Sequence, residues 1–490
     1  MNELQSSVPD VRVRALNDQP VRSDAAYVLY WSTAYRRAES NFALERAADW
    51  ARHLGLPLVV LSALRLDYRW ASDRLHAFLL DGIADLERQY ASSNVVHFVY
   101  VESKKDAGKG LLTALAGDAA VVIADDAPVF FLPAMTAVAA TRVGVLMEGV
   151  DHNGLLPLRA TDRVFLRAYD LRRYLQRHLP VYLDDTPSVG TLEDLPRPTS
   201  SLLVGVQTRW PSPAPSRSLV RSLPLDHSVA ATPLIGGPRA GSALLAQFVA
   251  ERLDRYEDRN HPDEEATSGL SPYLHFGNVS PHQVLAAIAA SENWSPDLIS
   301  EKADGGRKGW WGVSAAAEGF LDQLVTWREL GYRSAAYVSE NAEFEALPGW
   351  ALQTLADHAS DPREYIYTLE QFDAAETHDE IWNAAQRQLR NEGLIHNYLR
   401  MLWGKKILEW ARSPREAHDI MFELNDRYAL DGRDPNSVSG IHWVMGRYDR
   451  PWGPERAVFG KVRYMSSEAT RRKLRMKRYL AADQGEMFST

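Results

Sequence analysis

The sequence contains no cysteine among its 490 residues. Disulfides, a thiolate nucleophile, zinc–cysteine sites and iron–sulfur clusters bound through cysteine are therefore excluded. This composition is compatible with a reducing compartment, and we expect a cytoplasmic protein.

Several other signals are missing. The sequence has no apolar run of about eighteen residues, the length that a transmembrane helix needs, so we expect no membrane span. The N-terminus lacks the apolar segment of a secretory signal. Neither H-E-x-x-H, G-x-S-x-G nor a Walker A loop occurs, and no G-x-G-x-x-G follows the first expected strand. The usual signatures of zinc peptidases, serine hydrolases, P-loop enzymes and dinucleotide-binding domains are thus absent.

The formal net charge is −9, but the charges are unevenly distributed. Residues 441–480 contain eleven Lys or Arg and three Asp or Glu, a local charge of +8, which leaves −17 for the remainder. A basic segment on an acidic protein is typical of a phosphate-binding surface. A basic face that is merely solvated remains the alternative.

Residues 26–150 alternate short apolar runs with longer mixed segments. The runs that we expect to be buried strands are YVLYW, LPLVVLSAL, VVHFVYV, AAVVIAD and VGVLMEGV. Segments such as AESNFALERAADWARHLG separate most of them and have the composition of helices. This alternation predicts an α/β domain with a parallel, Rossmann-like sheet.

The composition changes twice further along the chain. Residues 181–240 contain nine prolines and many serines, which predicts a long irregular connection. From about residue 241 the periodicity is helical and aromatic residues are frequent, which predicts an all-α domain. We therefore divide the chain into a tail (1–22), an α/β domain (23–180), a linker (181–240), a helical domain (241–481) and a C-terminal tail (482–490).

A first candidate ligand site lies at 267–272. Thr267, Ser268 and Gly269 precede a helix that should begin at Ser271 and Pro272. Backbone N–H groups at a helix start, flanked by hydroxyls, suit a phosphate. An ordinary capped helix fits the spacing as well.

A second candidate is the turn YALDGRDPN, in which Asp431 and Asp434 flank Gly432 and Arg433. Two carboxylates could act as acid and base or accept hydrogen bonds from a heterocycle or ribose, whereas a metal normally needs more ligands. An Asp-Gly turn with a salt bridge is the simpler interpretation.

Two helical segments carry unusual aromatic residues. In HNYLRMLWGKKILEW, Trp403 and Trp410 fall on one helical face and Met401 on another, which also fits plain core packing. In FLDQLVTWREL, Gln323 and Trp327 are four residues apart and share a face. An amide beside a planar ring can recognise a nucleobase, or it can be ordinary packing.

Taken together, these motifs resemble a known family. SGLSPYLHFG, EYIYTLEQFDAAETHDEIWNAAQ, MLWGKKILEW, LNDRYALDGRDPN and FGKVRYM are similar to segments of the class II cyclobutane-pyrimidine-dimer DNA photolyases. The resemblance extends over most of the chain, from YVLYW through VDHNGLLPLR to FGKVRYM. It implies an antenna-type α/β domain, a helical domain that binds FAD, and a monomer that acts on UV-damaged, mainly double-stranded DNA.

The resemblance also assigns residues to a non-covalently bound FAD that is active in its reduced, anionic form. The residues implied in FAD binding are Tyr256, Thr267, Ser268, Gly269, Leu270, Ser271, Arg328, Asn425 and Asp431. Tyr256 and residues 267–271 would hold the phosphates, and Asn425 would lie near flavin N5. A deazaflavin-type antenna chromophore is implied as well, although no residue pattern marks its site.

The implied reaction is light-driven electron transfer from the flavin to a dimer flipped out of the duplex, followed by splitting of the cyclobutane bonds and return of the electron. The residues implied at the dimer are Gln323, Trp327, Met401, Trp443 and Arg450. Three tryptophans are implied to pass electrons to an oxidised flavin: Trp403 next to it, Trp382 further out, and Trp410 as a side branch.

Two departures from the family lie near the substrate. Gln323 stands where typical members have glutamate, and an amide cannot share a proton with a base that gains negative charge. The segment from Trp443 to Arg450 is also slightly shorter than usual. A preference for the pyrimidine–pyrimidone photoproduct therefore stays open. A cryptochrome-like photoreceptor is a further alternative, which the short stretch after Leu480 disfavours.

Overall fold

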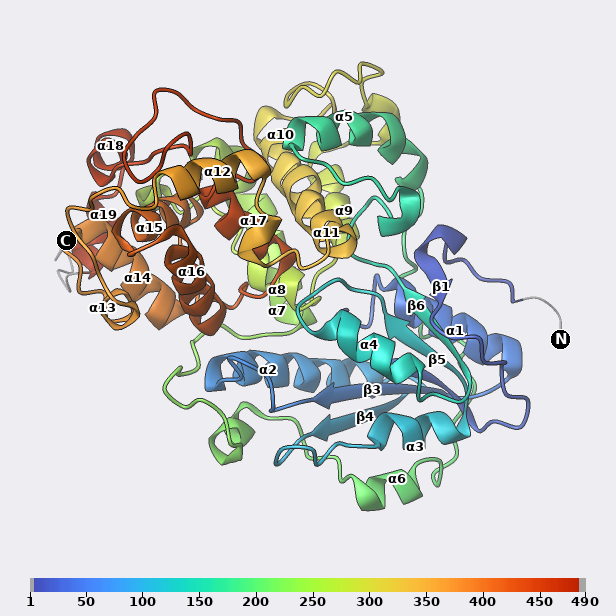
Figure 1. The fold of residues 1–490 in the computed structure, drawn as a ribbon. Coiled ribbons are helices and arrows are strands. Elements are labelled where there is room, and N and C mark those ends of the chain that lie inside the picture. Colours follow the sequence, from blue (N-terminus) through green and yellow to red (C-terminus); the bar gives the residue numbers. More distant parts are fainter. Residues whose placement is uncertain (1–3, 484–490) are drawn as a thin grey trace. The chain divides into compact units, whose positions relative to one another are not determined.

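The computed structural model describes residues 4–483, and contacts divide the chain into two compact units. Unit 1 comprises residues 1–162, 177–246 and 269–296, and unit 2 comprises residues 163–176, 247–268 and 297–490. Each unit is thus assembled from separate parts of the chain (Figure 1). The linear boundaries given above remain predictions from composition.

Unit 1 is built on a six-stranded sheet with the order β1-β6-β5-β2-β3-β4. The strands are β1 (Val13–Ala15), β2 (Tyr27–Trp31), β3 (Leu58–Leu64), β4 (Val96–Val101), β5 (Ala119–Asp125) and β6 (Leu146–Val150). β1 pairs antiparallel with β6, and all other pairs are parallel. The five predicted strands and the parallel α/β arrangement are confirmed. β1 was not predicted, because three residues carry too little periodicity to stand out from a loop.

Helices cover both faces of this sheet, which is why every residue of β2 and β5 is buried. The helices of unit 1 and its margins are α1 (Phe42–Leu54), α2 (Asp73–Tyr90), α3 (Leu111–Asp118), α4 (Leu132–Ala140), α6 (Val204–Arg209), α7 (Pro238–Glu251), α8 (Ser271–His275) and α9 (Pro281–Glu292). Right-handed crossovers place α1 and α2 on one face and α3 and α4 on the other. The predicted irregular connection contains α6, flanked by Leu203 and Trp210, which join the core beneath α3.

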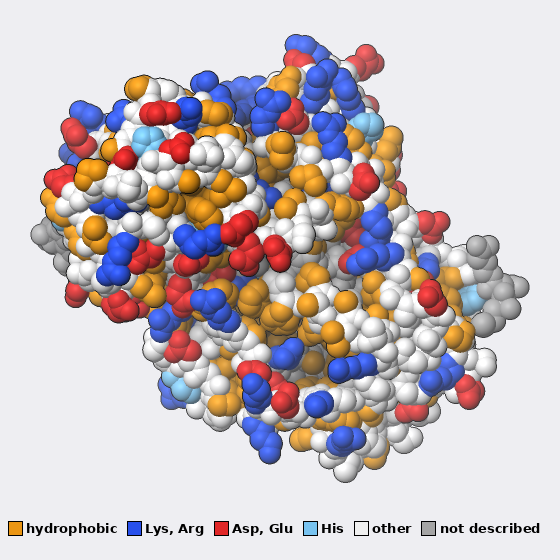
Figure 2. Space-filling view, viewed as in Figure 1, with side chains coloured by type: hydrophobic (Ala, Val, Ile, Leu, Met, Phe, Trp, Pro, Cys, Tyr) orange, Lys and Arg blue, Asp and Glu red, His pale blue; other side chains and the backbone are white. Residues whose placement is uncertain are grey.

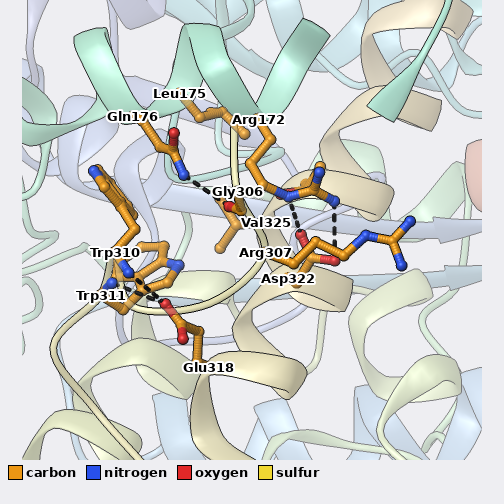
Figure 3. Close-up of a pocket in the computed structure, with 11 residues that line it drawn as sticks. Arg172, Leu175, Gln176, Gly306, Arg307, Trp310, Trp311, Glu318, Asp322 and Val325 are labelled. Atoms are coloured by element: carbon orange, nitrogen blue, oxygen red, sulfur yellow. Dashed lines mark hydrogen bonds and ion pairs between the residues drawn. The ribbon is translucent and has the colours of Figure 1, made fainter. Parts of the chain in front are cut away.

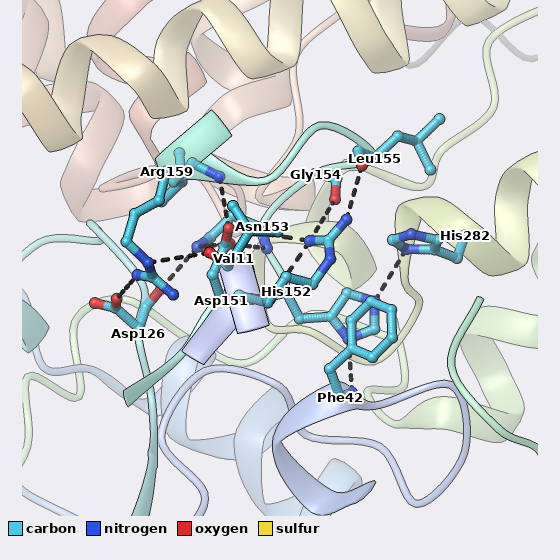
Figure 4. A network of polar contacts seen from close by, with 12 residues as sticks. Val11, Phe42, Asp126, Asp151, His152, Asn153, Gly154, Leu155, Arg159 and His282 are labelled. Carbon is cyan, nitrogen blue, oxygen red and sulfur yellow. Dashed lines mark hydrogen bonds and ion pairs between the residues drawn. The ribbon is translucent and has the colours of Figure 1, made fainter. Parts of the chain in front are cut away.

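The loop after β6 is fastened by a buried polar network (Figure 4). Asp151 accepts the backbone N–H of Leu158 over 2.6 Å, and Arg12 donates to the carbonyl of Leu155 over 2.7 Å. His152 Nδ1 accepts from Arg37 over 2.7 Å, which leaves its Nε2 to donate to His282 Nδ1 over 3.1 Å. These hydrogen bonds hold the backbone of the loop after β6 in place.

Unit 2 is helical, as predicted. Its helices are α5 (Ala168–His178, at its margin), α10 (Ala315–Leu321), α11 (Arg328–Tyr337), α12 (Gly349–Asp357), α13 (Leu369–Asp373), α14 (Glu380–Glu392), α15 (Asn397–Trp410), α16 (Pro414–Tyr428), α17 (Pro435–Val444), α18 (Ser467–Lys473) and α19 (Lys477–Asp483). A π-helical turn, Asp322–Trp327, joins α10 to α11. Aromatic side chains are prominent in its core, and Trp382 is fully buried.

Charged side chains of both signs are interspersed over most of the face shown in Figure 2, and Lys and Arg gather over α5 and the loop before α10. Within residues 4–483, no helix combines the length and apolarity that crossing a bilayer requires.

Candidate functional site

Three tryptophans form a connected series inside unit 2. Trp403, Trp382 and Trp410 are 2%, 0% and 3% exposed. The rings of Trp403 and Trp382 are stacked, with centroids 6.4 Å apart and planes within 5°, and Trp382 meets Trp410 edge-on at 6.3 Å. The indole N–H of Trp382 donates to the carbonyl of Trp403 over 3.0 Å. The predicted burial of Trp403 and Trp410 in a helix is therefore observed, and α14 supplies the ring between them.

The series continues to the surface through residues that sequence reasoning did not single out. Trp410 lies 5.7 Å from the ring of Tyr367 and 4.9 Å from that of His378. Tyr367 and His378 share a hydrogen bond of 2.7 Å, and Tyr365 stacks on His378 at 3.7 Å with 38% of its own surface exposed. Tyr365, Tyr367 and His378 all belong to the motif EYIYTLEQFDAAETHDE. The tyrosines and the histidine in this motif were the feature of the sequence that could have indicated the extension of the series.

Two residues of unit 2, Gln386 and Arg252, have buried donor atoms without a partner among residues 4–483. Gln386 uses its Oε1 to accept the indole N–H of Trp403 over 2.8 Å, so its buried Nε2 is left as a donor. Arg252 donates through Nη1 to the carbonyl of Thr267 over 3.2 Å, while its Nε and Nη2 remain unpaired. Buried donors without acceptors are rare in proteins. Both therefore fit a bound group rich in acceptors, such as a nucleotide cofactor.

The structure places the predicted phosphate segment as follows. Gly269 has φ = +70°, a conformation that favours glycine. A helix does begin at Ser271, as predicted, but α8 is only five residues long and Leu270 makes no side-chain cap. A helix dipole therefore contributes little at this segment. Further along, Ser280 and Gln283 form a capping box at the start of α9.

Tyr256 is 7% exposed and packs edge-on against Phe320 with ring centroids 5.0 Å apart. Burial raises the pKa of its phenol to about 12, so it remains a hydrogen-bond donor at neutral pH. Arg328 is buried, with its guanidinium 4.1 Å from the ring centroid of Tyr332.

The two carboxylates of the YALDGRDPN turn have separate roles. Asp431 pairs with Arg400 over 2.8 Å, while Asp434 caps α17 and accepts the hydroxyl hydrogen of Tyr332 over 2.8 Å. Nearby, Asn425 is 1% exposed and donates from Nδ2 to Ser437 Oγ over 2.5 Å. The described part of the chain contains no group of three or more acidic or histidine side chains arranged to bind a metal.

Gln323 and Trp327 face the same way. Within residues 321–330 every side chain is buried except these two, which are partly exposed. Their shared orientation, inferred from the spacing, is thus observed, although they lie on a π turn and not on a regular α-helix. An amide and an aromatic ring are therefore presented together on an otherwise core-facing segment.

Met401 and Trp443 lie on α15 and α17, two helices that pack against each other. Met401 Cε lies 3.7 Å from the position that a Cβ on Gly440 would occupy. Trp443 is partly exposed, with Lys405 Nζ 5.2 Å and the Arg463 guanidinium 5.7 Å from its ring centroid. Sequence reasoning missed Lys405 and Arg463 because neither is near Trp443 in the chain.

Lys405 is 0% exposed, and its Nζ donates to the carbonyl of Val444 over 2.5 Å. Burial, with a smaller contribution from the nearby Arg463 cation, lowers its pKa to about 7 despite Asp449. Burying a lysine costs the solvation energy of its charge, and lysines with such a lowered pKa cluster at functional sites.

The basic segment 441–480 divides into paired and stacked cations. Arg471, Arg472 and Arg475 form ion pairs with Glu380, Glu468 and Asp258. By contrast, Arg450 and Arg463 lie 4.6 and 5.0 Å from the ring centroid of Trp452. The phosphate-binding surface inferred from composition is therefore narrower than the local charge of +8 indicated.

Unit 1 contains a cavity of about 440 Å³. Trp31 at the end of β2, Phe131 and Met135 of the α4 region, and Arg65 and Arg142 contribute to its lining. It lies at the carboxyl ends of parallel strands beside β2 and β5, where the strand order reverses. Open α/β sheets bind ligands at such a switch point.

The comparisons with known proteins agree with this arrangement. No family model matches the chain. The deoxyribodipyrimidine photo-lyase of Methanothermobacter thermautotrophicus is 33% identical over 478 residues, which cover 97% of this chain and 98% of that protein.

Solved structures share the fold. A bacterial class III photolyase from Agrobacterium tumefaciens gives a TM-score of 0.68 at 17% identity over 94% of this chain and 86% of that one. An archaeal photolyase from Sulfolobus tokodaii, solved with two FAD molecules, gives 0.59 at 14% identity, covering 92% and 88%. The buried tryptophan series, the sheet with its cavity and the nearly full-length similarity converge, and the chain belongs to the deoxyribodipyrimidine photo-lyase family, whose members are lyases.

Proposed function

We propose that this protein repairs cyclobutane pyrimidine dimers in UV-damaged DNA by light-dependent electron transfer from reduced FAD, as a class II enzyme. The observation that carries the proposal is the stacked Trp403–Trp382 pair with the unpaired, buried Nε2 of Gln386 beside it. Neighbouring indole rings that lie close together can pass electrons from one to the next. A buried hydrogen-bond donor next to Trp403 fits a redox cofactor.

FAD, when bound, supplies the excited-state electron that the protein's own side chains cannot provide. We assign its binding to residues placed in the previous section: Tyr256, Thr267, Ser268, Gly269, Leu270, Ser271, Arg328, Asn425 and Asp431. Arg252 and Gln386 join this set because each has buried donors that lack partners within the described chain. Trp403, Trp382 and Trp410 would return electrons to a cofactor that has become oxidised.

The lesion would contact the partly exposed side chains of unit 2. Gln323 and Trp327 offer an amide and a ring on one face, and Met401, Trp443 and Arg450 complete the proposed set. A flipped dimer costs less to extrude than an intact pair because its stacking is already impaired. The partner is accordingly damaged, mainly double-stranded DNA, bound by a monomer.

The cavity of unit 1 is our candidate site for an antenna chromophore. Its volume of about 440 Å³ falls in the range of small-molecule sites, and aromatic and cationic side chains line it. A deazaflavin-type chromophore would meet Trp31 and Phe131 with its ring and Arg65 or Arg142 with its anionic groups. Replacing Met135 with Trp should abolish an added near-UV absorption band without changing repair under direct flavin excitation.

The decisive experiment measures repair by pre-reduced protein on oligonucleotides that carry one thymine dimer or one pyrimidine–pyrimidone photoproduct. We expect blue-light-dependent restoration of the dimer only. Activity on the photoproduct alone would instead indicate the altered preference that Gln323 suggests, and light-dependent spectral change without any repair would indicate a photoreceptor. In the Gln323→Glu variant, we expect dimer repair to be retained or faster.

A further inference from the structure

The π turn that carries Gln323 and Trp327 requires a physical cause. Asp322–Trp327 interrupts the continuous helical path from α10 to α11. Such turns are rare and concentrate at functional sites, since they distort an otherwise regular helix. The segment DQLVTW contains neither proline nor glycine, so its own backbone chemistry does not impose the distortion. Neighbouring elements must hold it.

Arg172 of α5 provides such a restraint (Figure 3). Its Nε and Nη2 donate to the two carboxylate oxygens of Asp322 over 2.7 and 3.1 Å, and its Nη1 donates to the carbonyl of Gly305 over 3.3 Å. The two side chains are only 7% and 12% exposed. A bidentate pair in a poorly solvated setting is strong and tolerates little change in geometry.

The surroundings of this pair are themselves fixed. Gln176, one turn further along α5, accepts the N–H of Gly305 over 2.7 Å and donates to the carbonyl of Gly306 over 3.0 Å. Glu318 of α10 accepts the N–H of Trp310 over 2.7 Å. Thus α5, the loop at 305–311 and α10 form one frame immediately before the π turn.

We propose that Arg172 is a positioning residue for lesion recognition: by clamping Asp322 it fixes the register of the π turn and so places Gln323 and Trp327 together on the solvent-facing side. The inference rests on the proposed function, because it takes these two residues as lesion contacts. A π turn accommodates one extra residue, so relaxation to a regular helix would rotate Gln323 by about 100° relative to α11. One member of the recognition pair would then face the core.

The test uses Arg172→Met and Arg172→Lys, with Arg167→Met as the matched control. Arg167 makes a bidentate pair with Asp170 at the start of the same helix, over 2.8 and 3.1 Å, but its side chain is 60% exposed. For each variant, we would measure the affinity for a duplex with one thymine dimer and for the same duplex without it. Amide hydrogen exchange of the 322–328 segment would be followed in parallel.

We expect Arg172→Met to lower the ratio of damaged to undamaged affinity roughly tenfold, in the range usual for residues that share contacts. In Arg172→Met, amide exchange at 322–328 should become faster and FAD content should stay the same. Arg167→Met should change neither the affinity ratio nor the exchange rate. Arg172→Lys keeps the positive charge but cannot make the bidentate contact with Asp322. It should therefore fold, with an affinity ratio between those of Arg172→Met and the unaltered protein. If Arg172→Met does not fold, the comparison of Arg172→Lys with Arg167→Met decides the matter.

A double-mutant cycle with Gln323→Ala separates positioning from general stability. Once the clamp is lost, Gln323 is already misplaced, so Arg172→Met/Gln323→Ala should bind the lesion no worse than Arg172→Met alone. Additive losses, or faster exchange without any change in the affinity ratio, would overturn the proposal. If the unaltered protein shows no preference for damaged DNA, the proposed function fails instead, and the exchange data still report whether the clamp holds the turn.

Discussion

Trp403 is a buried core side chain to which the proposed function adds a chemical role. Its ring is 2% exposed and stacks on Trp382, and its N–H is satisfied by Gln386. A leucine could fill part of this volume but could not be oxidised. Periodicity alone predicted a core residue, and the stacked geometry is what the proposed electron transfer through these rings requires.

Replacing Trp403 with Phe should leave repair by pre-reduced protein nearly unchanged and should abolish most photoreduction of oxidised FAD. Phenylalanine retains most of the packing but is far harder to oxidise, and the smaller ring should cost about 1–3 kcal/mol of stability. Absorption spectroscopy under blue light measures the reduction. Trp210→Phe, which alters a buried ring of unit 1 outside the series, is the control. Undiminished photoreduction in Trp403→Phe would return these rings to a packing role.

At the scale of elements, the contact between α15 and α17 shows a buried lysine hydrogen-bonded to a helix end. Lys405 donates to the carbonyl of Val444 at the C-terminus of α17, where a cation is favoured by the helix dipole. Val444 also lies against Gly404, where a Cβ would come within 2.6 Å of its side chain. Trp443 therefore lies at a helix end that is held in place by Lys405 and by the packing of Val444 against Gly404.

Lys405 should make stability rise with pH above neutrality. Its pKa is about 7 in the fold, against about 10.4 in the unfolded chain. Between these values the unfolded state binds more protons, so the free energy of unfolding should increase by about 3 kcal/mol from pH 7 to 9.5. Denaturant titrations at both pH values measure this.

In Lys405→Met the rise between pH 7 and 9.5 should largely disappear. Lys406→Met, a change at the adjacent position whose ammonium pairs with Glu409, should keep it. Equal pH dependence in all three proteins would show that Lys405 is not the group responsible.

At the scale of the whole molecule, we expect buried neutral histidines to make the fold acid-sensitive. Desolvation lowers the pKa of His97 and of His396 to about 4, and it lowers that of His282 well below its ordinary value. Each takes up a proton more readily when unfolded. The free energy of unfolding must therefore fall as the pH drops below about 6.5.

Replacing His97 with Gln should weaken this acid dependence. The pKa difference of about 2.5 corresponds to about 3 kcal/mol lost between pH 6.5 and 4. We expect the variant to lose correspondingly less stability over that interval, as measured by thermal unfolding. His53→Gln, a change at an exposed position of α1, serves as the control and should behave like the unaltered protein.

The salt dependence of DNA affinity should come from only a few Lys and Arg side chains of the basic segment. Arg450 and Arg463 stack on Trp452, whereas Arg472 is paired with Glu468. Arg463→Gln should weaken binding to all sequences and reduce the slope of log K against log salt by about 1. Arg472→Gln should change the slope less. Equal slopes for all three proteins would remove Arg463 from the DNA-binding face.

Much of the fold follows from local sequence. The five parallel strands are continuous apolar runs, the capping box at Ser280 is a short-range signal, and the helical unit has a clear helical periodicity. Strand β1 and helix α6 were not predicted because their few residues are stabilised mainly by partners elsewhere in the chain. The pairing of Gln323 with Trp327 on one face was also legible from their spacing.

The sequence by itself determined the α/β-plus-helical architecture, the burial of Trp403 and Trp410, and the candidate residues of the site. Only the tertiary structure decided that Trp382 from α14 stacks on Trp403, that Arg172 clamps Asp322, and that Lys405 lies beneath Trp443. Periodicity is a property of consecutive residues, whereas these contacts join side chains 21, 150 and 38 positions apart. Such pairs form because buried polar groups and rings must find partners in three dimensions, and no local pattern records which partner that will be.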